Sequence, residues 1–159
     1  GLSVRETLLI GRFRNLRGSG WRDLLLPMFV GDRAGRRRAD EILQMFDLAH
    51  LADEIATDLP YGTQRRVEIA RALMGAPRFL LLDEPAAGMN EQETAQLVQD
   101  VRRIRDEGIT VFLVEHDMAM VMSVSNKVVV LNFGRKIAEG TPAEVQADPE
   151  VIASYLGEQ

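Results

Sequence analysis

The sequence predicts an α/β protein that is mostly helical from its start to about Met74 and then forms part of a parallel sheet with flanking helices. Before Met74, apolar residues recur three and four positions apart, as they do on one face of an amphipathic helix. After it, the short apolar runs 79–82 and 109–114 are typical of buried parallel strands. A helical pattern separates the two runs, which indicates a strand-helix-strand unit.

Composition limits the classes of function that the chain can have. Its 159 residues suffice for one domain of ordinary size, and 46% hydrophobic with 27% charged residues is typical of a globular protein. The net charge of −5 gives no general attraction to nucleic acid or to an anionic membrane surface. Cysteine is absent, which excludes a disulfide framework, a cysteine-based zinc site and a thiol nucleophile. Apolar runs are far shorter than the ~20 residues of a membrane-spanning helix, so we expect any membrane contact to pass through a protein partner.

The helical half is predicted from its start signals and its periodicity. Ser3 and Glu6 form a capping-box pattern, which predicts a helix over 2–14. Residues 15–20 are expected to form a loop, and a second helix is expected from Arg36. We expect a short helix over 50–57 and a longer one that follows Pro60-Tyr61-Gly62 and runs to about Met74. Polar side chains of the longer helix are expected to lie mostly outward: Arg65, Arg66, Glu68 and Arg71.

The second half is predicted from alternating strand and helix patterns. A helix over 91–107 is expected to end at Gly108 and to separate the strands 79–82 and 109–114. A helix over 117–125 then leads to a strand over 127–131, with Gly134 at the turn of a hairpin. Two further helices are expected after Thr141 and Asp148, because each of these residues precedes a proline at a first helical position.

The acidic pair Asp83-Glu84 is the sharpest candidate for chemistry. It follows an apolar strand, at the end of an open parallel sheet where ligands bind. Mg²⁺ prefers carboxylate and water oxygens, so Asp83 can hold the ion while Glu84 polarises a water molecule for attack on a phosphate. An isolated Asp-Glu pair more often begins a solvated loop. The strand before this pair and Pro85 after it favour the functional interpretation.

Two other places could contribute to the same site. His116 follows the next strand, so it is expected at the same sheet edge as Glu84, where a neutral imidazole can contact a γ-phosphate or orient the attacking water. The alternative is a surface histidine before a helix capped by Asp117. Gly62 and Thr63 lie at a helix start, which is a natural anion site, although an ordinary start capped by Thr63 is favoured on this string alone.

Taken in order, the three strings 59–64, 79–85 and 114–117 resemble the second half of an ATP-binding-cassette (ABC) nucleotide-binding domain, over essentially the whole chain. The first lies where the family has its signature, LSGGQ in the commonest form. The second resembles the Walker B strand with its catalytic glutamate. Residues 86–90 occupy the D-loop position and His116 the switch-histidine position. Tyr-Gly in the signature, Glu-His-Asp-Met and the tail 148–157 are similar to the ATPases of branched-chain amino-acid importers.

This resemblance implies a partial P-loop NTPase-like parallel sheet, with an ABC-type helical subdomain over 1–75 and the C-terminal part of a RecA-like ATPase core over 76–159. It implies ATP and Mg²⁺ as cofactors. By the same resemblance Asp83 assists the metal, Glu84 activates water and His116 senses the γ-phosphate. The remaining site residues would approach ATP bound on the opposite subunit: Gly62, Thr63 and Gln64.

The resemblance also implies the partners and the cellular place of the chain. These partners are integral-membrane permease subunits and a second ATP-binding subunit, with a periplasmic or lipoprotein solute-binding protein acting indirectly and no nucleic acid. The expected location is cytoplasmic, peripheral on the inner face of the cell membrane. The expected function is that of an ATP-hydrolysing subunit, in fragment form, of an importer of branched-chain amino acids.

The sequence departs from the family pattern in two ways. Pro60 and Tyr61 stand where the common signature has serine and glycine, so the hydroxyl contact to the γ-phosphate is lost. No Gly-Lys-Ser/Thr phosphate loop (Walker A) is present, since the only lysines are Lys127 and Lys136, and the first glutamine, Gln44, lies in a predicted helix rather than a Q-loop. We therefore expect a chain without the N-terminal part of its domain, with negligible ATP affinity and turnover.

Two alternatives remain beside this interpretation. One is a catalytically inactive interaction module whose helical half docks a membrane permease. The other is a different ATPase of the ABC superfamily, such as a DNA-repair ATPase in which a long coiled coil interrupts the chain. Heptad repeats over several turns would indicate that second alternative, and the sequence has none.

Overall fold

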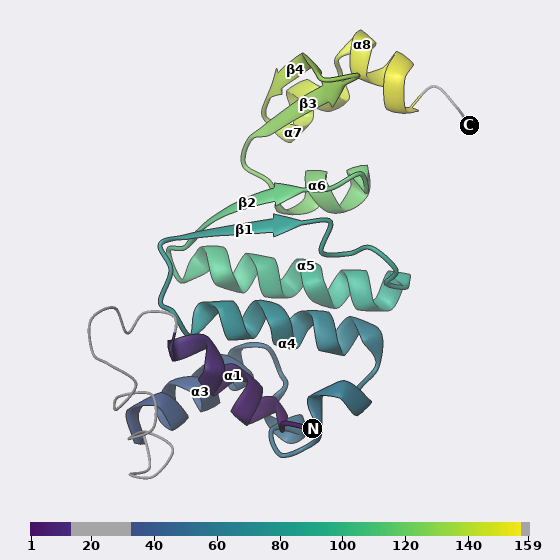
Figure 1. Ribbon diagram of the computed structural model, residues 1–159. Helices are drawn as coiled ribbons and strands as arrows, with labels where there is room; N and C mark the ends of the chain where they lie inside the picture. Colours follow the sequence, from purple (N-terminus) through teal and green to yellow (C-terminus); the bar gives the residue numbers. More distant parts are fainter. Residues whose placement is uncertain (14–32, 157–159) are drawn as a thin grey trace. The chain divides into compact units, whose positions relative to one another are not determined.

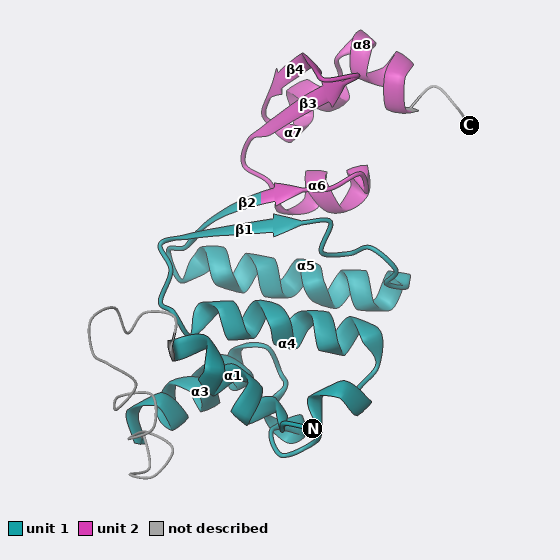
Figure 2. Cartoon of the chain, in the orientation of Figure 1, with its two compact units in different colours: residues 1–112 teal, residues 113–159 magenta. Residues whose placement is uncertain are grey.

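The computed structural model describes residues 1–13 and 33–156, and the loop expected at 15–20 lies outside these residues. The chain divides into two compact units, residues 1–112 and 113–159 (Figure 2). Figure 2 shows helices and strands in the first unit, and a hairpin with short helices in the second. The predicted functional division at residue 75 is a different boundary and stays a prediction.

The helical half of the first unit contains α1 (Val4–Phe13), α3 (Arg33–Met45) and α4 (Tyr61–Leu73). Ser3 and Glu6 make both hydrogen bonds of the predicted capping box, at 2.8 and 3.2 Å. Helix α1 packs against α3 and α4 (Figure 1). The apolar stripes that the sequence indicated form the core between them, and its fully buried members include Leu8, Ile42, Leu43, Phe46, Val67 and Leu73.

The short helix predicted over 50–57 is wrong. Two separate 3₁₀ turns lie there, η1 (Ala49–Leu51) and η2 (Ala56–Asp58). The carbonyl groups that would continue a helix accept hydrogen bonds from the start of α1 instead: Val4 N–H donates to Glu54 and Arg5 N–H to Ala52, each at 2.9 Å. Competition from a distant segment therefore breaks the helix in two.

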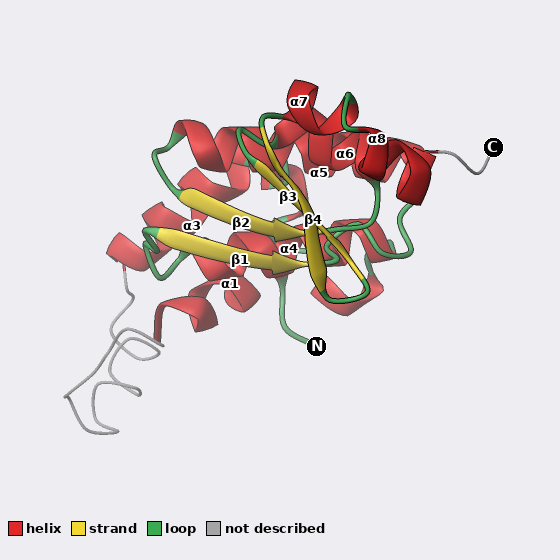
Figure 3. Cartoon of the chain, turned by 90° about the horizontal axis from the view of Figure 1, so that it is seen from above, coloured by secondary structure: helices red, strands yellow, loops and turns green. Residues whose placement is uncertain are grey.

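The strand-helix-strand unit appears as predicted, with β1 (Phe79–Asp83), α5 (Glu91–Asp106) and β2 (Thr110–Val114). The two strands pair in one sheet, and their arrows point the same way in Figure 3. Asn90 caps α5 in a capping box with Glu93, and the chain leaves the helix at Gly108 with a positive φ of 81°. Glycine suits this position because it adopts the left-handed conformation without strain.

The strands are buried on one face only, which corrects the expectation of fully buried strands. Along β1, Leu80 and Leu82 are each 7% exposed, whereas Phe79 and Leu81 are 57% and 60% exposed. Both α4 and α5 lie on the same side of β1 (Figure 1). Alternate side chains therefore face the helices, and the others, together with Phe112 of β2, face away from them.

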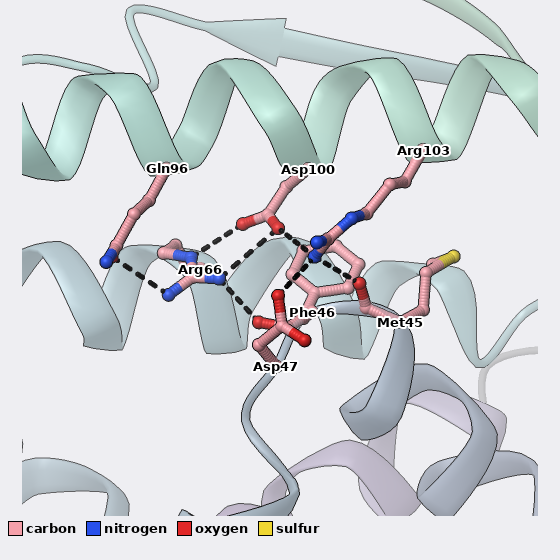
Figure 4. Close-up of polar contacts among 7 residues, drawn as sticks. All are labelled: Met45, Phe46, Asp47, Arg66, Gln96, Asp100 and Arg103. Carbon is pink, nitrogen blue, oxygen red and sulfur yellow. Dashed lines mark hydrogen bonds and ion pairs between the residues drawn. The ribbon is translucent and has the colours of Figure 1, made fainter.

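Arg66 is buried, so its predicted outward orientation is wrong. Its guanidinium group lies between α4 and α5 and binds the carboxylate of Asp100 through two hydrogen bonds, Nε to Oδ2 at 2.6 Å and Nη2 to Oδ1 at 3.2 Å (Figure 4). Nη2 also donates to the carbonyl oxygen of Phe46, and Nη1 donates to Gln96 at 3.2 Å. Periodicity cannot reveal such a residue, because a buried arginine has the same sequence pattern as a solvated one.

A second arginine completes this contact at the end of α3. Arg103 donates to the carbonyl oxygen of Met45 at 2.6 Å and pairs with the carboxylate of Asp47 at 2.8 Å (Figure 4). Asp47 has a positive φ of 56°, and Leu48 N–H closes the helix end by donating to Leu43 at 2.8 Å. The final carbonyl groups of a helix have no partner within it, so two arginines from α4 and α5 supply donors at the end of α3.

The second unit contains α6 (Met118–Val124), β3 (Val128–Asn132), β4 (Arg135–Gly140), α7 (Pro142–Gln146), α8 (Pro149–Val151) and a final π-helical turn, η3 (Ile152–Leu156). The predicted hairpin is confirmed, with Gly134 at its turn and φ of 75°. Thr141 and Asp148 cap α7 and α8 as predicted. Within residues 1–13 and 33–156, every helix is too short or too polar to be a transmembrane segment.

Replacing Arg66 with methionine is expected to lower the free energy of unfolding by about 3–5 kcal/mol, because the substitution leaves the carboxylate of Asp100 buried without its main partner. The matched control is Arg65→Met, which removes only contacts of a more exposed arginine and is expected to cost about 1 kcal/mol or less. Urea denaturation of the three proteins measures both effects. Equal losses for the two variants would contradict the assignment.

This loss is also expected to depend on pH. Burial raises the pKa of Asp100 above its ordinary 3.8, and the hydrogen bond from Arg66 opposes that rise. When an acid has a higher pKa in the folded state than in the unfolded state, the folded protein loses stability as pH rises from 3.8 through the folded pKa. Without Arg66 the folded pKa rises further, so the deficit of Arg66→Met should be smallest in acid and grow with pH. A deficit that shrinks with rising pH would be inconsistent with this contact.

The one-sided burial of β1 predicts unequal effects at two adjacent leucines. Leu82→Ala should cost about 2–5 kcal/mol, because it opens a cavity against the helices. Leu81→Ala should cost about 0.5 kcal/mol or less, since that side chain lies on the exposed face. Thermal or urea unfolding of the pair checks the difference, and similar losses would show that both faces of β1 are packed.

Candidate functional site

The acidic pair lies at the end of β1, where the chain turns sharply. Asp83 is the last residue of the strand, and Glu84 follows it with a positive φ of 42°. Left-handed backbone is unfavourable for a residue that carries a Cβ, and such residues cluster at functional sites. The turn is closed by a hydrogen bond from Ala87 N–H to the carbonyl oxygen of Glu84 at 3.1 Å, and Pro85 is buried beneath it. Both carboxyl-bearing residues remain exposed.

A groove of about 200 Å³ runs between β1 and α4. Its walls are formed by Arg65, Glu68, Ile69 and Ala72 of α4, together with residues 80–83 and Pro85. Small-molecule sites that enclose their ligand have volumes of roughly 300–1,000 Å³. Asp83 therefore lies beside the polar face of α4, in a groove too small to enclose a nucleotide.

The helix start predicted at the signature position is confirmed, but its cap is different. Helix α4 begins at Tyr61 with Pro60 at the capping position and no side-chain cap, so Thr63 lies in the first turn rather than at its cap. Gly62 is buried, and a Cβ added to it would lie 2.5 Å from both Cδ and Oε1 of Glu93. The start of α4 is therefore packed directly against the first turn of α5.

Gln64 has intrachain contacts of its own. Its amide nitrogen donates to the carbonyl oxygens of Leu59 at 2.7 Å and Thr57 at 3.1 Å. These bonds fix the segment that leads from η2 into α4. The role predicted for Gly62, Thr63 and Gln64 toward a nucleotide on another subunit stays a prediction.

Tyr61, which stands where the common signature has glycine, contacts both Arg65 and the turn that follows the acidic pair. Its hydroxyl accepts a hydrogen bond from Arg65 Nε at 2.9 Å, and the guanidinium carbon of Arg65 lies 5.4 Å from the centre of its ring. Hydrogen bonds to Glu68 and then to Tyr61 raise the pKa of Arg65. The ring also approaches Gly88, where an added Cβ would lie 3.3 Å from Tyr61 Cε1.

His116 belongs to the second unit, just after β2. Its side chain is 74% exposed, and Nδ1 lies 3.8 Å from a carboxylate oxygen of Glu115. Asp117 caps α6 by accepting from Met120 N–H at 3.0 Å, which confirms the expected helix start. The predicted meeting of His116 with Glu84 joins residues of different units and stays a prediction.

Both lysines of the chain lie in the second unit and bind one carboxylate. Lys127 Nζ lies 2.5 Å from Glu139 Oε1, and Lys136 Nζ lies 2.6 Å from Glu139 Oε2. These contacts lower the pKa of Glu139 to about 2. Neither lysine lies in a glycine-rich loop at a helix start, which is the setting of a phosphate-binding lysine.

The carboxylates of Asp83 and Glu84 suit a magnesium ion. They do not suit a metal ion whose ligands all come from the protein. Across the described part of the chain, no three His, Asp or Glu side chains gather as a candidate metal cluster. Mg²⁺ needs fewer protein ligands, because it keeps several waters and binds through one or two carboxylates together with substrate phosphates. The exposed pair at the end of β1 meets that requirement.

Sequence comparison finds close relatives among transport ATPases. BraF of Pseudomonas aeruginosa, a high-affinity branched-chain amino acid transport ATP-binding protein, is 43% identical over 99% of this chain and 63% of its own length. LivG of Escherichia coli, which carries the same description, is 39% identical over the same shares. LptB of Escherichia coli, a lipopolysaccharide export system ATP-binding protein, is 38% identical over 76% of the chain and 50% of its own length. The chain thus spans about 63% of the length of the first two relatives.

Solved structures agree with the sequence comparison. MJ1267 in its ADP conformation, an ATP-binding cassette of an ABC transporter, matches with a TM-score of 0.79 and 31% identity over 99% of this chain and 63% of that one. MJ0796, a bacterial ABC transporter cassette in a dimeric structure, matches with a TM-score of 0.68 and 25% identity, over 89% and 57% of the two chains. These matches confirm the α/β fold of the P-loop NTPase type.

Two family models match the sequence. The model of the branched-chain amino acid ATP-binding cassette transporter matches residues 135–159, which include the tail. The ABC transporter model matches residues 2–87, more than half of the chain, and includes both the start of α4 and the acidic pair. The protein therefore belongs to the ABC transporter family.

Proposed function

We propose that this chain is the part of an ATP-binding subunit that carries the signature and the Walker B carboxylates, in a transporter that imports branched-chain amino acids. The observation that carries the proposal is the acidic pair at the end of β1, with Asp83 lining the groove beside α4 and Glu84 in a left-handed turn. The match of the tail to the branched-chain amino acid transporter model and the identity to BraF and LivG support the substrate class.

In this proposal ATP and Mg²⁺ are the cofactors, and the metal would neutralise charge that develops on the transferred phosphoryl group. Asp83 would hold the metal, directly or through a water molecule. Glu84 accepts the proton of the attacking water, and its exposed position after the strand gives it access to a reacting group. His116 would contact the γ-phosphate.

The start of α4 contributes to a nucleotide bound on a second ATP-binding subunit. Backbone N–H groups and the positive end of the helix dipole favour phosphate at Gly62 and Thr63. Gln64 shapes this start through its bonds to Thr57 and Leu59. Pro60 and Tyr61 provide no small hydroxyl at this place, so the contact with phosphate depends on the backbone.

The partners in this proposal are integral-membrane permease subunits and a second ATP-binding subunit, with a solute-binding protein outside the membrane acting indirectly. The chain would be peripheral on the cytoplasmic face of the membrane. Its helical part, residues 1–75, would contact the permease, and residues 76–159 would belong to the ATPase core.

One observation favours a second candidate, the catalytically inactive module that docks a permease. Both lysines of the chain bind Glu139 in the hairpin of the second unit, so neither serves a phosphate loop. Under this alternative the helical part would bind the membrane partner while the acidic pair took no part in catalysis.

The purified 159-residue chain is expected to bind ATP negligibly and to hydrolyse none, because it offers no phosphate-binding lysine. Isothermal titration with Mg-ATP and a phosphate-release assay measure the two properties. Turnover that Glu84→Gln abolished would overturn this expectation and show that the chain builds a complete site.

In a full-length subunit that carries these residues and is assembled with its permease, Glu84→Gln should lower kcat by about 10²–10⁴-fold, because the general base is lost. The control is Glu91→Gln, an exposed acid in the first turn of α5 that should leave kcat within about twofold. Steady-state ATPase kinetics give the comparison. Full activity of Glu84→Gln would favour the inactive module instead.

A further inference from the structure

The buried signature glycine has an intrachain neighbour. Gly62 is the second residue of α4, and a Cβ built on it would meet Glu93 at Cδ and Oε1, both 2.5 Å away, and at Cγ, 2.9 Å away. Real Cβ atoms do not make contacts this short, so any larger residue at position 62 must displace the side chain of Glu93. The usual expectation for a glycine at a phosphate-binding helix start is different, namely that the ligand itself needs the space.

Moving the side chain of Glu93 aside costs free energy. It is the third residue of α5, and its carboxylate oxygen Oε2 accepts from Asn90 N–H at 3.0 Å while Asn90 Oδ1 accepts from Glu93 N–H at 3.0 Å. Displacing the carboxyl group would break the side-chain half of this capping box, the hydrogen bond from Asn90 N–H, which contributes about 0.5–1.5 kcal/mol. The same side chain therefore begins α5 and lies against the beginning of α4.

A second contact joins the same two segments. The ring of Tyr61, the first residue of α4, approaches Gly88 in the turn that leads from Glu84 to α5. Gly88 has a positive φ of 78°, so both its backbone and its neighbour favour glycine. Two successive residues of α4 thus rest on the segment that follows the acidic pair.

We propose that Glu93 is a positioning residue, which sets the start of the signature helix relative to the turn that carries Glu84. Gly62 is glycine because Glu93 occupies the space beside it. The expected effect of Glu93 on catalysis rests on the proposed function. Its expected effect on stability rests only on the contact with Gly62. The size of Glu93 and its acceptor oxygen are the properties that matter, since both act at short range.

The contact is tested by a double-mutant cycle on the 159-residue chain. In a helix interior alanine is more favourable than glycine by about 1 kcal/mol, so at the second residue of α4 the gain is at most this large, a rise of up to about 2–4 °C in Tm for a chain of this size. In the background of Glu93→Ala, Gly62→Ala should show that full rise. In the wild-type background the displaced capping box should cancel the rise or turn it into a fall. Equal shifts in Tm in the two backgrounds would overturn the proposal.

Gly108→Ala is the control for the cycle. This glycine has a positive φ of 81° and no atom within 4 Å of an added Cβ, so its substitution strains only the backbone. It should lower Tm by the same amount with Glu93 or with alanine at position 93. If the Tm shift of Gly108→Ala depended on the residue at position 93, the cycle would be reporting a general change of stability. The proposal would then fail.

The positioning role is tested in the full-length subunit assembled with its permease, well below the unfolding temperature of each variant. Glu93→Ala should lower kcat about 10- to 100-fold through misplacement of the two motifs, with KM for ATP changed less than about twofold. Glu93→Gln keeps the size and the acceptor, so it should retain most of kcat. Equal losses in the two variants, or a loss confined to KM, would overturn the role.

Failure of the proposed function gives a different result. A wild-type subunit without ATPase activity in the presence of its permease would refute that function. The double-mutant cycle is measured by Tm and needs no nucleotide. It would still show whether Glu93 occupies the space beside Gly62.

Discussion

The first unit depends on one buried ion pair, between Arg66 of α4 and Asp100 of α5. Asp100 is fully buried, and its carboxylate is costly to keep away from water unless donors surround it. Arg66 supplies two of them and also donates to the carbonyl oxygen of Phe46. One guanidinium group therefore joins three helices, and its planar set of donors can do this where a lysine cannot.

This arrangement explains how the candidate site is held in place. Helix α4 begins with the signature and carries Arg66 one turn later, so the ion pair fixes α4 against α5 close to the motif. Helix α5 in turn begins just after the acidic pair and its turn. Polar contacts inside the helical layer thus connect the segments that carry two motifs about twenty residues apart in the sequence, while the sheet contributes only the end of β1.

Much of the fold and the position of the acidic pair could be predicted from the sequence. Apolar spacing, caps and breakers are local signals, and they located α4, α5, the strands and the hairpin. The predictions were wrong where contacts with distant segments determine the local structure. Residues 50–57 lose their helix to the start of α1, Arg66 is drawn inward by Asp100, and β1 is covered on one side only. The contact of Gly62 with Glu93 is likewise invisible in the sequence, because it joins two helix starts.

The left-handed turn at Glu84 has a consequence for how this chain tolerates change. A residue with a Cβ in this conformation costs about 1–2 kcal/mol, and glycine would remove most of that penalty. At position 84, glycine would therefore give the more stable fold, but it would lack the carboxylate of glutamate. Stability alone would favour glycine at position 84, whereas the proposed catalytic role needs the carboxylate there.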